Sequence, residues 1–224
     1  MSILRNIYNA FYNNLIGDGA YVRIIKGCIY TILIFAVALA LGLLLSAGLT
    51  FLRTCKNRFW AAVGCGAAFL LKGTPVTVAL MLWYYTFLGG MHRGGLIVAF
   101  LALGLYAGGH LSDILVRAIL RENKMRSETV NKRARQEFFT ALLPFVTEQS
   151  LFEIKRLCTF LLQMSTFVGT IGVMDLMQVL LGQGMKNKAP FFAMGCAAVF
   201  YLVIELILEG VFAWIGKKIT GEED

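Results

Sequence analysis

The chain has 224 residues, of which 58% are hydrophobic and only 15% are charged, and its mean hydropathy is +0.71. A water-soluble domain of this length would have more apolar surface than its core could bury, which excludes an ordinary soluble protein. The formal net charge of +8 is explained by cytoplasmic loops rich in lysine and arginine, as multi-pass membrane proteins have them, without nucleic-acid binding.

The apolar segments predict five membrane spans. The first run, residues 24–52, is too long for a signal peptide and long enough for a retained span. The second run, residues 59–88, is interrupted at Lys72-Gly73-Thr74-Pro75, where the proline removes a backbone donor and predicts a kink or break. The other three spans are predicted at residues 95–120, 151–181 and 190–214, and the fourth continues past Ser165 as a glycine-containing stretch.

The distribution of basic residues predicts the orientation. Five spans place the termini on opposite sides, and a cytoplasmic loop at residues 117–135 leaves twelve basic residues inside and six outside, which satisfies the positive-inside rule. The N-terminus is then outside and the C-terminus is in the cytoplasm. The inside group is Arg53, Lys56, Arg58, Arg117, Arg121, Lys124, Arg126, Lys132, Arg133, Arg135, Lys217 and Lys218; the outside group is Arg5, Arg23, Lys26, Arg93, Lys186 and Lys188.

A strongly polar segment, residues 121–136, separates the third and fourth spans. It contains no proline or glycine and is dominated by good helix formers, so we expect a helical cytoplasmic element with a charged surface. A docking site for a soluble partner would take this form. The alternative interpretation is a solvated loop that only fixes topology.

Three short motifs occur in order along the chain. Lys72-Gly73-Thr74-Pro75 lies between an apolar helix and an apolar run that ends in Trp83-Tyr84-Tyr85, and Leu142-Leu143-Pro144 follows the polar segment. About twenty residues later comes Gln163-Met164-Ser165-Thr166, with Ile171-Gly172-Val173-Met174-Asp175-Leu176 directly after it. Together these motifs resemble the [RK]-G-T-P motif, the loop-closing leucine-proline and the lysine-x-threonine-serine segment of the polar amino acid family of ABC importer permeases, and the resemblance covers roughly residues 20–215.

The resemblance implies an all-α transmembrane fold, the five-span type I ABC importer permease, as a single domain over residues 1–224. It implies a permease subunit that forms half of the pathway for a small polar solute, an amino acid, in the bacterial cytoplasmic (inner) membrane. The implied partners are ABC ATPase subunits, a second permease subunit and an extracytoplasmic solute-binding protein. No cofactor is expected in this chain, since ATP and Mg²⁺ would bind to the ATPase subunits.

The cytoplasmic coupling loop departs from the family pattern. The family carries G-Q-x-E-A-A and a later glycine, whereas counting back from Pro144 places residues 122–127 and Asn131 at these positions. Only the place and the polarity of the loop remain. The residues expected to couple to the ATPase are Arg121, Glu122, Lys124, Arg126, Glu128, Asn131, Arg133 and Pro144.

The resemblance and the irregular backbone also indicate a translocation pathway or gate. Its expected residues are Lys72, Gly73, Thr74, Pro75, Gln163, Ser165 and Thr166. Irregular backbone at membrane depth is tolerated beside protein or a water-filled cavity, which favours a role in the pathway. The alternatives are a helix boundary at which Lys72 reaches the membrane surface, and hydrogen bonds between helices for the later polar residues.

Several single residues have more than one interpretation. Glu205 and Glu209 lie one helical turn apart in the last span and would bind a cation, couple to protons or form structural pairs. His110 is interpreted as a satisfied core histidine, and the glycines at positions 42, 64, 66, 108 and 109 are expected to permit close helix packing. The scattered cysteines and two histidines predict no metal site.

Two other functional classes stay open. An ion-coupled carrier would be supported only by Glu205 and Glu209. An integral membrane enzyme would need clustered His, Asp or Glu at a membrane face, which the sequence lacks. No Walker motif or catalytic triad motif is present, so ATP is expected to bind elsewhere.

Overall fold

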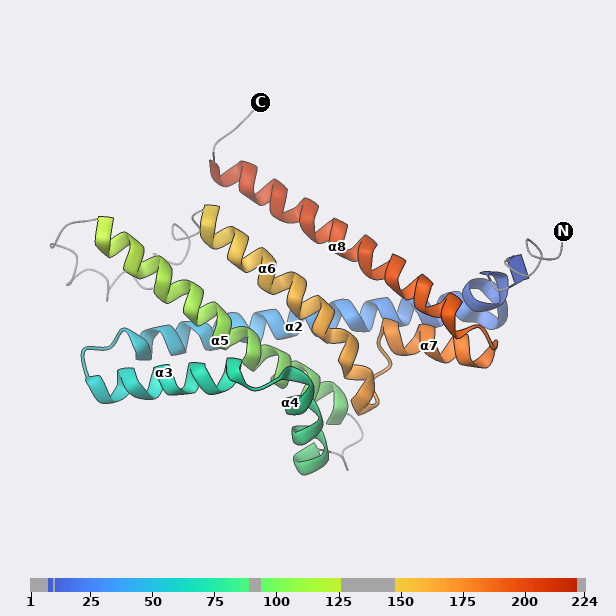
Figure 1. Cartoon of the computed structure of the whole chain (residues 1–224), viewed down its shortest axis with the longest axis horizontal. Helices are drawn as coiled ribbons and strands as arrows, with labels where there is room; N and C mark the ends of the chain where they lie inside the picture. Colours follow the sequence, from blue (N-terminus) through green and yellow to red (C-terminus); the bar gives the residue numbers. More distant parts are fainter. Residues whose placement is uncertain (1–7, 10, 89–93, 126–147, 221–224) are drawn as a thin grey trace.

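The computed structural model describes residues 8–9, 11–88, 94–125 and 148–220 (Figure 1), and these residues form helices and turns with no strand among them. In lipid, backbone polar groups must be satisfied within the chain, and helices achieve this. Three helices are long and apolar enough to cross a membrane: α2 (Ala20–Arg53), α5 (Gly94–Met125) and α8 (Pro190–Thr220).

Two further spans are bent pairs of helices. In the first, α3 (Arg58–Gly73) is followed by α4 (Val76–Trp83) and a π-helical turn (Tyr84–Leu88), with a bend of 93°. In the second, α6 (Glu148–Ser165) continues as a 3₁₀ segment (Thr166–Ile171) and then bends by 55° into α7 (Leu176–Lys186). If each pair counts as one span, the described residues contain five, as the apolar pattern predicts.

Local chemistry explains both bends. At the first, Thr74 and Pro75 have extended backbone conformations with ψ of 125° and 129°, which confirms the break predicted at the proline. At the second, Gly172 ends the 3₁₀ segment in the left-handed region with φ of +79°. The buried Asp175 then caps α7, because its side chain accepts a hydrogen bond from the backbone N–H of Gln178 at 3.0 Å.

The core forms where α2 crosses α5. The buried positions of α2 recur every three or four residues, and small residues such as Ala38, Gly42 and Ser46 occupy part of this stripe. A Cβ on Gly42 would lie 2.6 Å from the Cβ of Ala107, so the glycine permits the close approach. A Cβ at position 64, 108 or 109 would also meet atoms of a neighbouring helix, which confirms the prediction of close helix packing there. The prediction is wrong for Gly66, because a Cβ at this position would have no atom of the chain within 4 Å.

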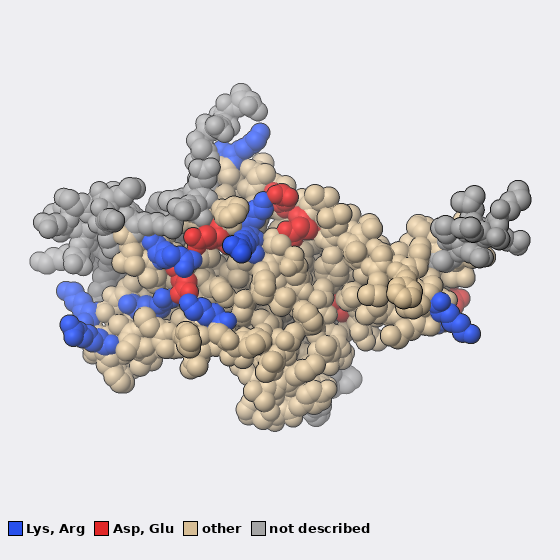
Figure 2. All heavy atoms as spheres, in the orientation of Figure 1, with Lys and Arg blue, Asp and Glu red and all other residues tan. Residues whose placement is uncertain are grey.

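The surface fits a lipid environment. In Figure 2, most charged side chains gather over the helices toward one end of the long axis and a few lie at the other end, and the surface between them is largely uncharged. The middle of α8 exposes a row of large apolar side chains, Val199, Leu202, Val203, Leu206, Ile207 and Val211. So large an exposed apolar face would be a liability in water, and it is the normal exterior of a span in a bilayer. The structure is that of a multi-pass membrane protein.

Candidate functional site

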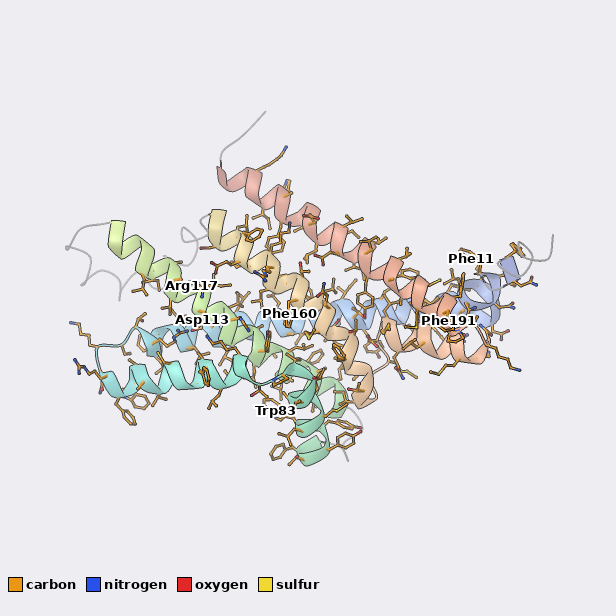
Figure 3. The ribbon with its side chains drawn as sticks, in the orientation of Figure 1. Phe11, Trp83, Asp113, Arg117, Phe160 and Phe191 are labelled. Atoms are coloured by element: carbon orange, nitrogen blue, oxygen red, sulfur yellow. The ribbon has the colours of Figure 1, made fainter. Side chains whose placement is uncertain are left out.

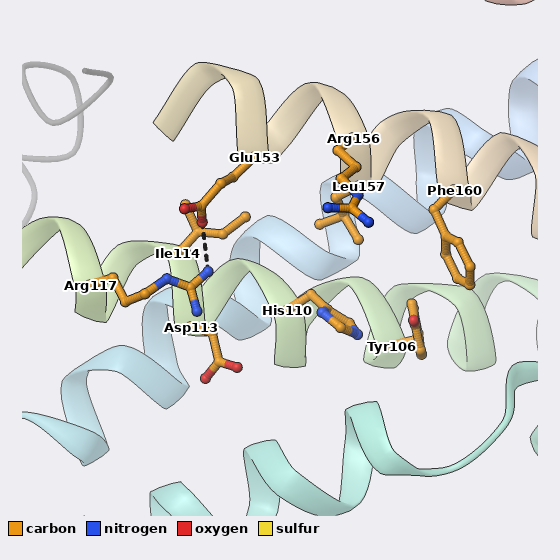
Figure 4. Close-up of a pocket in the computed structure, with 9 residues that line it drawn as sticks. All are labelled: Tyr106, His110, Asp113, Ile114, Arg117, Glu153, Arg156, Leu157 and Phe160. Atoms are coloured by element: carbon orange, nitrogen blue, oxygen red, sulfur yellow. Dashed lines mark hydrogen bonds and ion pairs between the residues drawn. The ribbon is translucent and has the colours of Figure 1, made fainter. Parts of the chain in front are cut away.

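A cavity of about 450 Å³ lies between α5 and α6 (Figure 4). The lining positions on each helix are three or four residues apart, so one face of each helix borders the cavity. Its residues are Tyr106, His110, Asp113, Ile114 and Arg117 from α5, and Glu153, Arg156, Leu157 and Phe160 from α6. In Figure 3 the labelled Asp113, Arg117 and Phe160 lie on α5 and α6, away from the end of the molecule that carries Phe11 and Phe191.

Polar groups occupy one end of this cavity and aromatic rings the other. Arg117 Nη2 donates to Glu153 Oε2 at 2.6 Å and joins the two helices. At the opposite end, the Tyr106 ring stacks on Phe160 with 5.4 Å between centroids, and its centroid lies 4.5 Å from that of His110. The cavity can therefore hold a small molecule that has both a charged part and a short apolar part.

His110 differs from the sequence-based interpretation. Its Nε2 atom is buried and has no hydrogen-bond partner among the described residues, which contradicts the interpretation of a satisfied core histidine. A buried polar atom without a partner is costly unless a ligand or water satisfies it. The His110 side chain lines the cavity, but its Nε2 atom is itself covered by the surrounding protein.

Asp113 is the centre of an ionic cluster on the side of α5 that faces α2 and α3. Its Oδ1 accepts from Arg53 Nη1 at 2.6 Å and its Oδ2 accepts from the ammonium group of Lys72. The side chains of Arg53 and Asp113 are each 15% exposed, so the charges are largely removed from solvent. The cluster joins the ends of α2 and α3 to α5, and it holds Lys72, which the sequence assigned to the pathway, against a carboxylate.

The other predicted pathway residues lie at the two bends. The hydroxyls of Thr74, Ser165 and Thr166 donate to the carbonyls of Leu70, Leu162 and Gln163 at 2.9, 2.7 and 2.7 Å, so each is satisfied within its own helix. Gln163 is exposed, whereas Ser165 is fully buried, and Gly73 and Pro75 form the break itself.

The structure brings the two bends together. Val76 and Leu80 of α4 belong to the same buried cluster as Val168 and Ile171 of the 3₁₀ segment. None of the predicted pathway residues lines the cavity, although Lys72 reaches its Asp113.

The two acids of the last span face α6. Thr159 Oγ1 donates to Glu205 Oε1 at 2.6 Å, and Lys155 Nζ lies 2.5 Å from Glu209 Oε1. The basic partner of Glu209 is therefore on α6 and not at the C-terminal end of α8. Neither acid lines the cavity.

The predicted coupling residues are described only in part. Arg121, Glu122 and Lys124 lie on the backbone of the last turns of α5, which runs to Met125. The others, Arg126, Glu128, Asn131, Arg133 and Pro144, lie outside the described residues. Within the described part of the chain, no three His, Cys, Asp or Glu side chains are close enough to hold a metal ion.

Comparison with known proteins gives consistent results, although no family model matches the chain. A protein of Rickettsia conorii, named as a glutamine transport system permease protein GlnP, is 22% identical over 200 residues, which are 87% of this chain and 92% of that protein. The histidine/lysine/arginine/ornithine transport system permease protein HisM of Escherichia coli K12 is 24% identical over 206 residues, which are 86% of this chain and 87% of the relative.

A solved structure shares the fold. It is the crystal structure of an amino acid ABC transporter with histidines, with a TM-score of 0.74, 17% identity, and coverage of 88% of this chain and 94% of that one. The resemblance found from the three short motifs is therefore confirmed, and so is the all-α transmembrane fold of a type I permease.

Proposed function

We propose that the chain is the permease subunit of an ATP-driven ABC importer for amino acids and forms half of the translocation pathway. The observation that carries this function is the arrangement of three long helices and two bent pairs, which matches an amino acid ABC transporter over 88% of the chain. The chemistry of the cavity agrees with it. Ion pairs, an arginine and aromatic faces suit the transient binding of a small polar solute.

The energy for transport would come from partners. ATP and Mg²⁺ would bind to ABC ATPase subunits, while a second permease subunit would complete the pathway and an extracytoplasmic binding protein would deliver the solute. The position of the cavity supports a pathway in this chain that is driven by a separate ATPase. The two helices that line it, α5 and α6, are also the two that border residues 126–147, so a force applied there reaches the cavity through rigid helices.

The two bends are proposed as the gate of the pathway. Thr74, Pro75, Ser165 and Thr166 lie where the helices break, and the segments that follow pack against each other through Val76 and Val168. Helices that are already broken can change direction there with little loss of hydrogen bonding. Lys72 would take part indirectly, because its ion pair with Asp113 fixes the end of α3.

The orientation is proposed with the N-terminus outside and the C-terminus in the cytoplasm. Lys155 and Arg156 were left out of the basic count because they lie close to a span end. They belong to the first three turns of α6, next to the residues assigned to the cytoplasm, and so they add to the positive charge on that side.

Single cysteines at Glu128 and at the exposed Lys188, in a chain without its five native cysteines, test the orientation. We expect an impermeant thiol reagent to label Lys188→Cys but not Glu128→Cys in intact cells. The opposite pattern would invert the topology.

ATP hydrolysis by the assembled complex tests the function. In nanodiscs, the purified chain alone should hydrolyse no ATP, whereas the chain with its ATPase should hydrolyse ATP faster when the solute-loaded binding protein is added.

A double variant tests the proposed docking segment, residues 121–136. Arg126→Glu with Arg133→Glu should lower both ATPase co-purification and stimulated hydrolysis. The effect should be larger at low salt, because salt screens surface charges beyond about 10 Å at 0.1 M. Lys186→Glu with Lys188→Glu, at and just after the C-terminal end of α7, is the matched control, because the proposed orientation places these residues on the opposite side of the membrane. Equal co-purification of both double variants would reject the charged docking surface.

A further inference from the structure

Resting on the proposed gate, we propose that the second bend is a hinge at Met174 between two separately packed parts of the helical bundle, and that Asp175 fixes the far side of this hinge. The near part contains α4, α5, α6 and the 3₁₀ segment, and the far part contains α7 and the first half of α8 (Figure 1). The helix α2 runs through both parts. Asp175 is then a positioning residue of the gate and does not bind the solute.

Two hydrophobic clusters meet at the bend. The larger cluster joins α2, α4, α5, α6 and the 3₁₀ segment, and among the described residues it contains none of α7 or α8. The buried residues of the smaller cluster are Ile24, Leu176, Leu180 and Ala197, from α2, α7 and α8. Because protein interiors are close-packed, helices that share a cluster move together. The chain therefore passes from one rigid part to the other shortly before Leu176.

The near side of the hinge ends at Val173. A Cβ on Gly95 would lie 2.6 Å from the carbonyl oxygen of Ile171, so the first turn of α5 contacts the end of the 3₁₀ segment directly. Val173 is buried in the larger cluster as well. Met174 is 64% exposed and belongs to neither cluster. The backbone can therefore change direction at Met174 without exposing a packed side chain.

The far side begins with Asp175, which is completely buried. Its Oδ1 accepts a hydrogen bond from the backbone N–H of Gln178 at 3.0 Å, and its Oδ2 accepts one from the hydroxyl of Tyr201 at 3.3 Å. One oxygen thus caps α7, and the other joins this cap to α8. A buried carboxylate with both oxygens engaged by the protein is closed to a solute, which favours a positioning role.

The helix α2 holds the same point of α7. The fully buried Thr31 accepts a hydrogen bond at its Oγ1 from the backbone N–H of Leu176 at 3.1 Å. One turn earlier on the same face of α2, a Cβ on Gly27 would lie 3.2 Å from the carbonyl oxygen of Asp175, so the two backbones are in close contact. The start of α7 is therefore held by α2 and α8, and we expect it to move with them.

A disulfide across the hinge tests whether the hinge moves. A Cβ on Gly169, in the near part, would lie 3.4 Å from the Cβ of Gln178, in the far part, which is close to the separation of about 3.5–4.5 Å in disulfides. Gly169→Cys with Gln178→Cys, in a chain without its native cysteines, is reconstituted with the ATPase and the binding protein. Uptake of radiolabelled L-glutamine and L-arginine, supplied separately, should fall roughly tenfold or more after oxidation and recover when the disulfide is reduced.

Leu180→Cys with Ala197→Cys is the matched control, because both residues belong to the smaller cluster in the far part. Its disulfide should leave uptake within about twofold of the reduced state. Mass spectrometry of the linked peptides verifies both disulfides. Equal uptake by the oxidised and the reduced hinge variant would overturn the proposal, and so would loss of uptake when positions 180 and 197 are linked.

Hydrogen exchange of the chain alone in nanodiscs tests the role of Asp175 without transport. Asp175→Leu should speed exchange of the backbone amides of Leu176–Val179 about two- to tenfold, which corresponds to the loss of one ordinary hydrogen bond. Asp175→Asn should keep the parent rates, because asparagine caps a helix about as well as aspartate. Faster exchange in both variants, or in neither, would contradict the assignment of Asp175.

The uptake assay separates a positioning role of Asp175 from solute binding. Asp175→Asn should keep the KM of the parent chain for the transported solute, whereas a raised KM would show that the carboxylate binds the solute. Absence of uptake by the parent chain itself would count against the proposed function. The exchange rates do not depend on the ATPase, so they decide the role of Asp175 in that case too.

Discussion

Replacing Asp113 by alanine is expected to destabilise the chain by about 3 kcal/mol, the low end of the range of roughly 3–5 kcal/mol for breaking a buried ion pair, because the cluster is not fully buried. The carboxylate pairs with both Arg53 and Lys72, and these two cations would be left in a low-dielectric environment without this partner. The cluster also ties α2 and α3 to α5, so its loss weakens contacts between three helices. The free energy of unfolding, from thermal or denaturant unfolding of the purified chain in detergent, provides the measurement.

A more exposed pair gives the control for this prediction. The side chains of Arg117 and Glu153 are 49% and 27% exposed, and pairs that solvent reaches are worth only about 0–1 kcal/mol. Glu153→Ala should therefore cost clearly less than Asp113→Ala. The triple variant Arg53→Met, Lys72→Met and Asp113→Asn should recover much of the lost stability, because it removes the unpaired charges. Equal losses for the two single alanine variants would show that the Asp113 cluster does not hold the helices together.

Replacing Gly42 by leucine is the second change from which we expect a large effect. A Cβ at this position would lie 2.6 Å from the Cβ of Ala107 and 3.2 Å from backbone atoms of Gly104 and Gly108 on α5. Backbone atoms cannot move aside as a flexible side chain can, so α2 and α5 would have to separate. Overpacking a core typically costs about 1–3 kcal/mol, and a leucine at a helix crossing should reach the upper part of this range.

Gly48 on the same helix is the matched control. A Cβ there would have nothing within 4 Å, so Gly48→Leu should leave the stability of the isolated chain almost unchanged. Both variants add the same side chain to α2 six residues apart, and therefore the comparison isolates the packing term. Similar melting temperatures for the two variants, measured in the same detergent, would contradict the close approach of α2 and α5.

The spans could be predicted from the sequence because lipid imposes a length and a polarity on every segment that crosses it. Three long helices and the break at Pro75 followed directly from this constraint. The second bend could be predicted only as a glycine-containing continuation. Its angle depends on the left-handed Gly172 and on the cap that Asp175 forms, and the hydroxyl of Tyr201, 3.3 Å from Asp175 on another helix, supports that cap. A pattern along one segment does not specify such contacts.

The cavity could not be predicted for the same reason. Arg117 and Glu153 are 36 residues apart and Lys72 and Asp113 are 41 apart, so neither pair is a local motif. His110 was interpreted as a satisfied core residue because histidines in apolar helices usually find partners. The signal that was present, charged residues recurring every three or four positions near the ends of two spans, indicates a polar helix face but not which helix it meets.

The most direct test of transport driven by a partner ATPase is amino acid uptake into proteoliposomes. L-Glutamine and L-arginine are supplied separately as radiolabelled solutes, and the vesicles contain the chain with or without its ATPase and binding protein. We predict accumulation only when the ATPase, ATP and the binding protein are all present, and no loss of uptake when an uncoupler abolishes the proton gradient. Uptake by the chain alone, driven by a proton gradient and abolished by Glu205→Gln or Glu209→Gln, would contradict this account and identify an ion-coupled carrier.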